Sequence, residues 1–326
     1  MRILQGFFSR LFYSLILLLF VLVLNFTLIH LTPGDPAQVI AGQMGGATEE
    51  ILNEIRAAYG LDKPFSTQLF TYLGKVLHGD LGFSFYFNGP VSELIWQRVP
   101  ATILLVVSAL FFSVFVGTFL GVLAAKKPNG TLSYIVTILA LLGYSAPVFW
   151  TGMILLIVFA GWLPLFPASG MADVTLVGSG WLAATLDVMH HLILPMFTLG
   201  IIYVAQFSRL ARASMLDVMG SDYIRTARAK GVSETKVVYK HALRNAVLPV
   251  VTMTGLQMSY LFSGAVLVET VFNWPGMGRL AFDSILRRDH PTILGILFLS
   301  TFIVVAANLF TDLSYRIIDP RIRAGN

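Results

Sequence analysis

Cysteine is absent from this chain of 326 residues, and charged residues are scarce. Without cysteine, the chain has no disulfide framework, no thiolate metal site and no cysteine nucleophile. Only 12% of its residues are charged, about half the roughly 25% usual in soluble domains, while 56% are hydrophobic. A soluble protein of this length could not cover so much apolar surface. The composition therefore argues against a cytosolic enzyme, a disordered chain and a disulfide-rich secreted module.

Lysine and arginine are also absent from the middle of six long apolar segments. Each segment is close to the roughly 20 residues that a membrane-spanning helix needs, which favours six spans over the buried helices of a soluble protein. The segments are Leu11–Leu31, Ala101–Ala125, Ser133–Ala160, His190–Phe207, Val247–Val268 and Thr292–Leu313. The first is longer than the roughly 7–15 apolar residues of a signal peptide. We therefore expect it to be retained as a span.

The basic residues are distributed unequally between the two sides of these spans. One side comprises the N-terminus, Lys126–Lys127, Ser208–Ala246 and the C-terminal tail, and it holds 15 of the 22 Lys and Arg residues but 5 of the 17 acidic residues. Basic loops remain in the cytoplasm. The distribution predicts that both termini are cytoplasmic and that three connections are external.

The first external connection, Thr32–Arg98, is too long to be a bare loop. Thr48 and Ser66 are candidate N-caps of two helices, and Gly60 is a candidate stop for the first of them. The segment can serve as a lid packed on the helix ends or as a docking surface for an external partner. Its residues leave both interpretations open.

Small residues recur at every fourth position of the second span. They are Ala109, Ser113, Gly117, Gly121 and Ala125. Together they form a helix face that another backbone can approach closely. Ordinary packing within the bundle explains this face, and an interface with another membrane subunit is the alternative.

Polar residues and a proline interrupt the apolar spans at a few positions. Pro147 predicts a kink in the third span, because it cannot donate to the carbonyl of Gly143 and crowds it. Candidate residues of a translocation pathway are Tyr144, Ser145, Pro147, Gln257 and Tyr260. The alternative is that such groups only form hydrogen bonds between helices.

Other membrane functions lack the residues they need. No chain of buried carboxylates crosses the spans and no inverted repeat is evident, which argues against an ion-coupled secondary transporter. A membrane-embedded enzyme would need a nucleophile, a metal cluster or an acid–base pair. The adjacent His190 and His191 are a poor metal pair, because neighbouring residues point to different faces of a helix.

The segment between the fourth and fifth spans carries the most informative pattern. Its eight basic residues are Arg209, Arg212, Arg225, Arg228, Lys230, Lys236, Lys240 and Arg244. Ser221 is a candidate N-cap of a short helix, Gly231 can end that helix in the left-handed conformation, and Ser233 can begin a second helix. Composition alone fits a solvated basic loop near anionic lipid as well as a docking site.

These residues resemble the cytoplasmic signature of permease subunits of ATP-binding-cassette (ABC) importers. The signature is Glu-Ala-Ala, three residues, Gly, nine residues, Ile, one residue and Leu-Pro. Gly231, Ala227 and Leu243 match it, whereas Arg225, Thr226, His241 and Arg244 stand at positions of Glu, the first Ala, Ile and Pro. The stretches Tyr223–Gly231 and His241–Ala246 are much closer to the peptide and nickel branch of these permeases.

Further stretches along the chain extend this resemblance almost from end to end. They are Leu31–Pro36, Gly79–Gly82, Glu269–Gly278 and Asp319–Arg321. They are typical of the first of the two permeases in such systems, the dipeptide and oligopeptide permease B type. The resemblance implies an all-α membrane protein with the type I ABC importer permease fold, comprising six transmembrane helices, cytoplasmic termini and a helical external segment.

The resemblance also implies an organisation and a set of partners. Residues 1–31 would form the N-terminus and first span, 32–100 the external segment, and 101–326 the permease core, with a cytoplasmic coupling loop over 208–246. The expected partners are a second homologous permease, two cytoplasmic ATPases, an external solute-binding protein and membrane lipid, without nucleic acid. The expected location is the bacterial inner membrane.

The chain contains no Gly-x4-Gly-Lys-Ser/Thr phosphate loop. We therefore expect a permease subunit that is not itself an enzyme and holds no cofactor, with ATP and Mg bound by the partner ATPases. The resemblance implies that ATPase coupling uses Asp222, Tyr223, Arg225, Thr226, Ala227, Arg228 and Gly231. Peptides are the expected cargo, and nickel, glutathione, opines and oligosaccharides are the alternatives within the family.

Overall fold

The computed structural model describes residues 2–31, 36–43, 48–84, 86–173, 175 and 180–318. Thr32–Asp35, at the end of the first span, and the Asp319–Arg321 motif lie outside these residues. The chain divides into two compact units: residues 1–100 with 276–309, and residues 101–275 with 310–326. The two units are described in turn.

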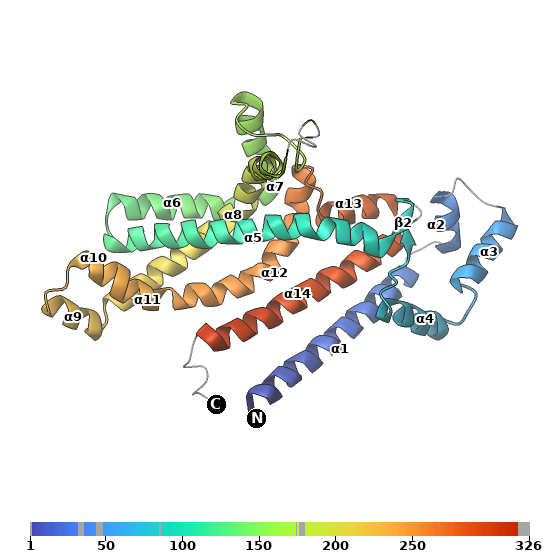
Figure 1. Ribbon diagram of the computed structural model, residues 1–326, viewed down its shortest axis with the longest axis horizontal. Helices are drawn as coiled ribbons and strands as arrows, with labels where there is room; N and C mark the ends of the chain where they lie inside the picture. The colour runs from blue at the N-terminus through green and yellow to red at the C-terminus, as the bar shows by residue number, and fades with distance from the viewer. Residues whose placement is uncertain are drawn as a thin grey trace. The chain divides into compact units, whose positions relative to one another are not determined.

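The first unit holds the predicted external segment. Its elements are α1 (Arg2–Leu31), α2 (Pro36–Gln43), α3 (Glu49–Tyr59), α4 (Phe65–Leu77), β1 (Phe83–Ser84), β2 (Gly89–Pro90), the first turns of α5 (Val91–Lys126), α13 (Met277–Arg287) and most of α14 (His290–Ile318) (Figure 1). The two short strands pair antiparallel, with Ser84 opposite Gly89. Val91, Ile95, Leu280 and Ile296 lie in its main apolar core.

Helix α4 packs against the end of α1, as the lid interpretation of the external segment expects. The rings of Phe26 and Tyr72 stack with centroids 5.2 Å apart, and His30 Nε2 forms a 2.9 Å hydrogen bond with Gln68 Oε1. Burial raises the pKa of Tyr72 to about 12, because the phenolate would lose its hydration. The segment is therefore anchored through aromatic contacts.

The predicted positions of the helix ends in this segment are correct in two of three cases, although the Thr48 side chain makes no capping hydrogen bond. α3 begins directly after Thr48 and ends at Gly60, whose φ of 65° is the left-handed conformation that glycine adopts at little cost. The prediction for Ser66 is wrong, because α4 begins one residue earlier, at Phe65. Pro64, with φ fixed near −55°, precedes it, and the Phe65 ring packs 5.4 Å from that of Phe26.

The second unit is a helical bundle. Its elements are the rest of α5, α6 (Thr131–Ser145), α7 (Val148–Leu155), the π-helix η1 (Leu156–Trp162), α8 (Trp181–Met219), α9 (Asp222–Ala229), α10 (Glu234–Lys236), the π-helix η3 (Val237–Ala242), α11 (Leu243–Ala246) and α12 (Leu248–Val271). α8 packs against α6, α7 and α12. The short helices α9, α10 and α11 gather at one end of this unit (Figure 1).

The small-residue face of α5 packs on α8 of the same chain. A Cβ atom on Gly117 would lie 2.6 Å from the Phe207 Cβ, and one on Gly121 would lie 2.5 Å from the Ser208 carbonyl oxygen. Phe207, Ser208 and Ala211 are buried. We call this contact the α5–α8 seam. At these two glycines, the small-residue face of α5 is therefore used for packing within the bundle.

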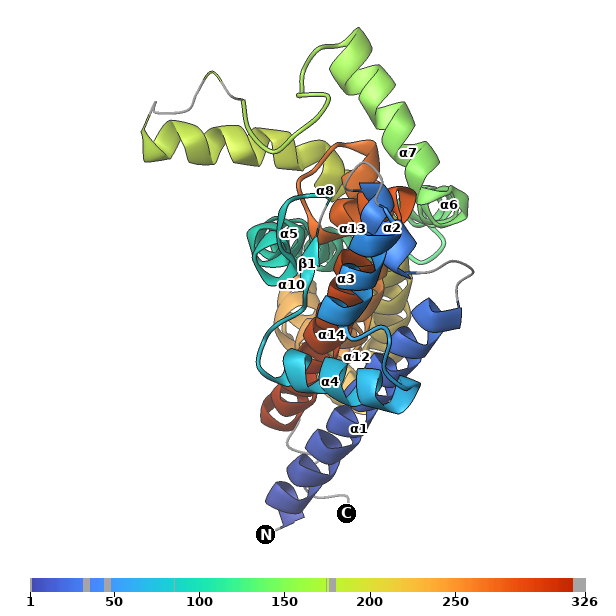
Figure 2. The same cartoon turned by 90° about the vertical axis from the view of Figure 1, so that its right-hand side faces the viewer.

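Four helices in the described residues are long and apolar enough to cross a membrane: α1, α5, α8 and α14. Two bent pairs raise the number to six if each pair is one span. One pair joins α6 to α7 and η1 at 107°, and the other is α12, bent by 56° between Met258 and Tyr260. Figure 2 shows α7 leaving α6 steeply. The all-α membrane fold is thus confirmed, although Pro147 marks a break rather than the kink that we predicted.

Candidate functional site

The residues after α8 fold into a compact unit of short helices, which we call the knuckle (residues 221–246). Residues 208–219 are not part of a loop, because they form the last turns of α8. α9 begins after Ser221, but the Ser221 hydroxyl donates to the Val218 carbonyl over 2.6 Å instead of capping α9. The position of the helix start therefore agrees with the sequence, whereas the capping bond is absent.

Gly231 ends α9 in the way that its sequence position predicts. Its φ is 75°, a value at which a side chain is strained. The Gly231 N–H donates to the Arg228 carbonyl over 2.9 Å, and the Val232 N–H donates to the Ala227 carbonyl over 3.2 Å. These bonds satisfy carbonyls at the helix end, so α9 stops sharply after eight residues.

One buried side chain anchors α9 to the bundle. Ile224 has no exposed surface and packs in an apolar cluster with Met215, Val237 and Val238. Tyr223 adds a polar attachment, because its hydroxyl oxygen accepts a 2.7 Å hydrogen bond from Asn245 Nδ2. α9 is therefore fixed to α8, η3 and α11 through its inner face.

The outer face of α9 is polar and open to solvent. The Asp222 side chain is 96% exposed and the Arg225 side chain is 73% exposed. Arg228 donates to Glu234 over 2.7 Å, and this hydrogen bond lowers the pKa of the Glu234 carboxyl. Thr226 and Lys230 are also exposed. A short rigid helix with a charged outer face has the form needed to enter a groove on another protein.

The predicted coupling residues are mostly exposed. Ala227 is half-buried, Tyr223 is exposed although its hydroxyl is bonded to Asn245, and the other five are exposed: Asp222, Arg225, Thr226, Arg228 and Gly231. The sequence pattern did not single out Ile224, although it is the residue that holds the helix in place. Its isolation as an apolar residue between Tyr223 and Arg225 could have identified it.

The predicted pathway residues fall into two groups. Tyr144, Ser145 and Pro147 lie at the break between α6 and α7, where Ser145 Oγ donates to the Leu141 carbonyl over 2.9 Å. Gln257 and Tyr260 lie on α12; Gln257 is buried, whereas Tyr260 is 66% exposed. The polar residues that join these groups are on α8.

Two α8 residues contact the two groups. Gln206 Oε1 accepts a 2.8 Å hydrogen bond from Gln257 Nε2, and the guanidinium carbon of Arg209 lies 5.2 Å from the centre of the Tyr144 ring. Gln206 and Arg209 are one turn apart. The sequence analysis placed Arg209 in a cytoplasmic loop and so missed its position beside Tyr144.

Two buried carboxylates also escaped the sequence analysis. Glu269 in the second unit accepts a 2.6 Å hydrogen bond from the Thr102 hydroxyl and has no exposed surface. In the first unit, Asp289 is equally buried and accepts from Ser84 over 2.6 Å and from Thr292 over 2.7 Å. Each carboxylate joins residues far apart in sequence, which indicates a structural role in fixing helix ends.

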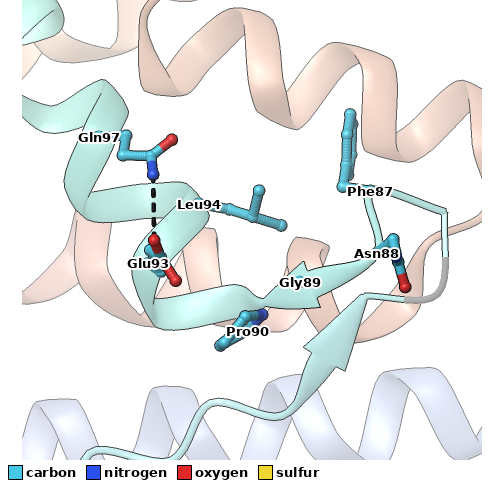
Figure 3. A pocket seen from close by; sticks show the side chains of 7 residues that line it. All are labelled: Phe87, Asn88, Gly89, Pro90, Glu93, Leu94 and Gln97. Atoms are coloured by element: carbon cyan, nitrogen blue, oxygen red, sulfur yellow. Dashed lines mark hydrogen bonds between the residues drawn. The ribbon is translucent and has the colours of Figure 1, made fainter.

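A shallow hollow of about 210 Å³ lies beside the β1–β2 hairpin in the first unit. Figure 3 shows Asn88 and Pro90 on the hairpin and Glu93, Leu94 and Gln97 on the following helix. Gln97 Nε2 donates to Glu93 Oε1 over 3.3 Å. The hollow is lined by both polar and apolar residues and lies in the predicted external segment. Within the described residues, no group of three or more His, Cys, Asp or Glu side chains could hold a metal ion.

Comparison with known proteins identifies relatives along nearly the whole chain. The chain is 41% identical to the dipeptide transport system permease protein DppB of Escherichia coli over 317 residues, covering 92% of this chain and 93% of DppB. It is 40% identical to the oligopeptide transport system permease protein AppB of Bacillus subtilis over 311 residues, covering 95% and 96%.

A solved structure of the MetNI methionine ABC transporter in an inward facing conformation shares the fold. The match has a TM-score of 0.54 at 17% identity and covers 70% of this chain and 97% of the other.

Two family models cover the chain. The N-terminal model of binding-protein-dependent transport system membrane components matches residues 3–106, and the model of the inner membrane component itself matches residues 117–324. These matches confirm the resemblance that the cytoplasmic residues indicated, and they identify a multi-pass membrane protein. The chain belongs to the family of binding-protein-dependent transport system inner membrane components.

Proposed function

We propose that this chain is the permease subunit of a peptide importer driven by ATP, and that α9 couples it to an ATPase. The observation that carries the proposal is the geometry of the knuckle. Ile224 fixes the inner face of α9, Gly231 ends the helix, and a charged outer face projects into solvent. Such a helix can transmit the movement of a partner to the bundle without bending.

The direction of transport and the cargo are inferred from the relatives. Binding-protein-dependent systems take up solutes that an external binding protein delivers, and the relatives in the comparison are named for dipeptides and oligopeptides. We infer that the same cargo passes between this chain and a second, homologous permease. Closure of two cytoplasmic ATPases on ATP and Mg would switch the pair between inward- and outward-facing states.

The chain contains no Gly-x4-Gly-Lys-Ser/Thr phosphate loop, which supports the proposal that other subunits hydrolyse ATP. The test is reconstitution of the complete complex in vesicles with its binding protein. Uptake of labelled peptides is expected to require ATP and the binding protein, and the purified chain alone is expected to hydrolyse no ATP. Uptake that proceeds without the ATPases would contradict the proposal, as would ATP hydrolysis that stays with this chain after the other subunits are removed.

The same reconstitution distinguishes the cargo. Peptides, nickel chelates, glutathione, opines and oligosaccharides are offered one at a time, and uptake and stimulated ATP hydrolysis are measured for each. Peptides alone are expected to give both responses. A response to a different class only would replace the peptide assignment and leave the permease function intact.

A further inference from the structure

Two arginines one turn apart on α8 point in opposite directions along α6. Arg212 Nε donates to Ser133 Oγ over 3.1 Å, and its terminal nitrogen donates to the Pro128 carbonyl over 3.3 Å. Both contacts lie at the start of α6, next to the basic pair Lys126–Lys127. Arg209 instead extends to Tyr144, near the other end of α6.

The difference in depth between these contacts is large. Ser133 and Tyr144 are separated by 11 residues of α6, which correspond to about 16 Å along a helix. An arginine that faces lipid directs its guanidinium toward the nearest headgroups. Arg209 differs from Arg212, because its charged end lies beside Tyr144 at the far end of α6. We therefore expect its surroundings to be aqueous or polar.

Polar side chains of α8 and α12 continue along the same side of α8. Gln206, one turn before Arg209, is bonded to Gln257 on α12. The Gln257 Oε1 and Gln206 Nε2 atoms are not used in that bond and can meet further polar groups. Arg209 is exposed, and no carboxylate within the described part of the chain forms an ion pair with it. A guanidinium and an aromatic ring are thus exposed here, one turn away from an amide pair of which Gln206 is half-buried and Gln257 is buried.

We propose that Arg209, held on the Tyr144 ring, binds the C-terminal carboxylate of a peptide in the translocation pathway. A guanidinium binds a carboxylate through two parallel hydrogen bonds, and stacking on an aromatic ring orients it for that contact. Gln206 lies one turn before Arg209 on α8 and is half-buried, so its free amide nitrogen can bond the peptide backbone. This assignment rests on the proposed function, because it presumes that peptides enter the pathway.

The absence of natural cysteine allows a direct test. A Ser145→Cys variant places the only thiol of this chain beside Tyr144. The assembled complex, purified without the binding protein, is labelled with a water-soluble maleimide, and the label on this chain is measured with trialanine or trialanine amide present. Trialanine is expected to slow labelling, and the amide is expected to have little effect, since only trialanine carries the C-terminal carboxylate.

Arginine variants in the Ser145→Cys background assign the effect to one side chain. Arg209→Gln is expected to raise the trialanine concentration for half-protection roughly tenfold, because hydrogen bonds to a charged group are lost. Arg212→Gln is the matched control, since its arginine lies one turn away and points to Pro128; protection by trialanine is expected to persist. Arg209→Lys, which keeps the charge but loses the fork of donors, is expected to be intermediate.

Three outcomes would overturn the assignment. They are a thiol at position 145 that does not react, equal protection by the two peptides, and protection that survives Arg209→Gln. Uptake of trialanine by the unmodified complex with its binding protein is measured in parallel. If that uptake is absent, the proposed function fails; if it is present while protection does not depend on Arg209, only the site fails.

Discussion

The α5–α8 seam and the knuckle both depend on glycine, but for opposite physical reasons. At the seam, a side chain on Gly117 or Gly121 would collide with the backbone or Cβ atoms of α8 within 3 Å. At the knuckle, nothing lies within 4 Å of a Cβ on Gly231, yet its φ of 75° disfavours any side chain. The seam requires space between helices, whereas the knuckle requires a particular backbone turn.

This difference separates the part that holds the bundle together from the part that we propose to meet a partner. The seam is buried and joins two long helices, so damage there affects the whole fold. The knuckle is attached through Ile224 and a few hydrogen bonds, and its outer face makes few contacts within the chain. Substitutions in both regions, from severe to mild, test whether the stability of the bundle and the proposed coupling to an ATPase can be changed independently.

The largest effect is expected for Gly121→Leu. Its Cβ would lie 2.5 Å from the Ser208 oxygen and 2.7 Å from the Ala211 Cβ, and overpacking costs roughly 1–3 kcal/mol and occasionally more. The amount of folded protein in membranes and its unfolding temperature in detergent are both expected to fall. Gly74→Leu in α4, where nothing lies within 4 Å, is the control. Equal stability of the two variants would refute the role of the seam.

A smaller, local effect is expected for Ile224→Asp. This change places a carboxylate among Met215, Val237 and Val238, at a cost of a few kcal/mol, and so detaches α9 while leaving the seam intact. Trypsin should cleave after Arg225 and Lys230, although the bundle still inserts and assembles. Thr235→Asp, on an exposed position of α10, should stay resistant. Loss of the whole bundle in Ile224→Asp would show that the two regions are not independent.

Gly231→Leu is expected to uncouple transport without unfolding the protein. The strain of a side chain at positive φ is roughly 1 kcal/mol or somewhat more, which can displace a helix of two turns but not a bundle. Peptide uptake per ATP hydrolysed, measured in vesicles at matched abundance, should fall.

The matched control for that variant is Gly79→Leu. Gly79 has a φ of 81° and equally open surroundings, but it lies in the predicted external segment. The backbone strain is therefore the same, and only its location differs. Equal coupling in the two variants would remove the special role of Gly231 in the knuckle.

The smallest effect is expected for the Arg228–Glu234 pair at acidic pH. The hydrogen bond from Arg228 lowers the Glu234 pKa in the folded protein, so its stabilisation is complete above the unfolded pKa of about 4.3 and is lost as pH falls through the lower folded value. Hydrogen exchange of the Val232 amide should quicken over that window. Both residues are solvent-exposed, so salt should weaken the effect.

A double substitution supplies the control for this prediction. In Arg228→Ala combined with Glu234→Ala, neither group titrates, and hydrogen exchange of Val232, corrected for its intrinsic pH dependence, should not change over the same window. A pH response that persists in the double variant would assign it to Asp222, the other carboxylate in the sequence of the knuckle.

Several local features were predictable because neighbouring residues determine them. The apolar runs indicated the helices that can cross a membrane, and Gly60 and Gly231 end helices where the sequence placed the stops. Pro147 predicted a disruption of the third span, since its missing donor acts within one turn. The start of α4 was misjudged, because packing of Phe65 against Phe26 outweighs the capping preference of Ser66.

The candidate pathway required contacts that no local pattern contains. Gln206 and Gln257 are 51 residues apart in sequence, and the approach of Arg209 to Tyr144 depends on how α8 lies against α6. A basic residue near the end of a helix suggested a solvated loop, and only the neighbouring helix shows that it points away from that loop. The burial of Glu269 likewise depends on Thr102, 167 residues away.

The sequence by itself determined the membrane-spanning character, the family and the helix ends at Gly60 and Gly231, because hydrophobic length, charge and glycine conformation act over a few residues. The tertiary structure alone decided which face of α5 meets α8, how sharply the chain breaks at Pro147, and which polar groups come together. Those outcomes depend on close packing between distant segments, where a collision or a hydrogen bond is set by the positions of both partners.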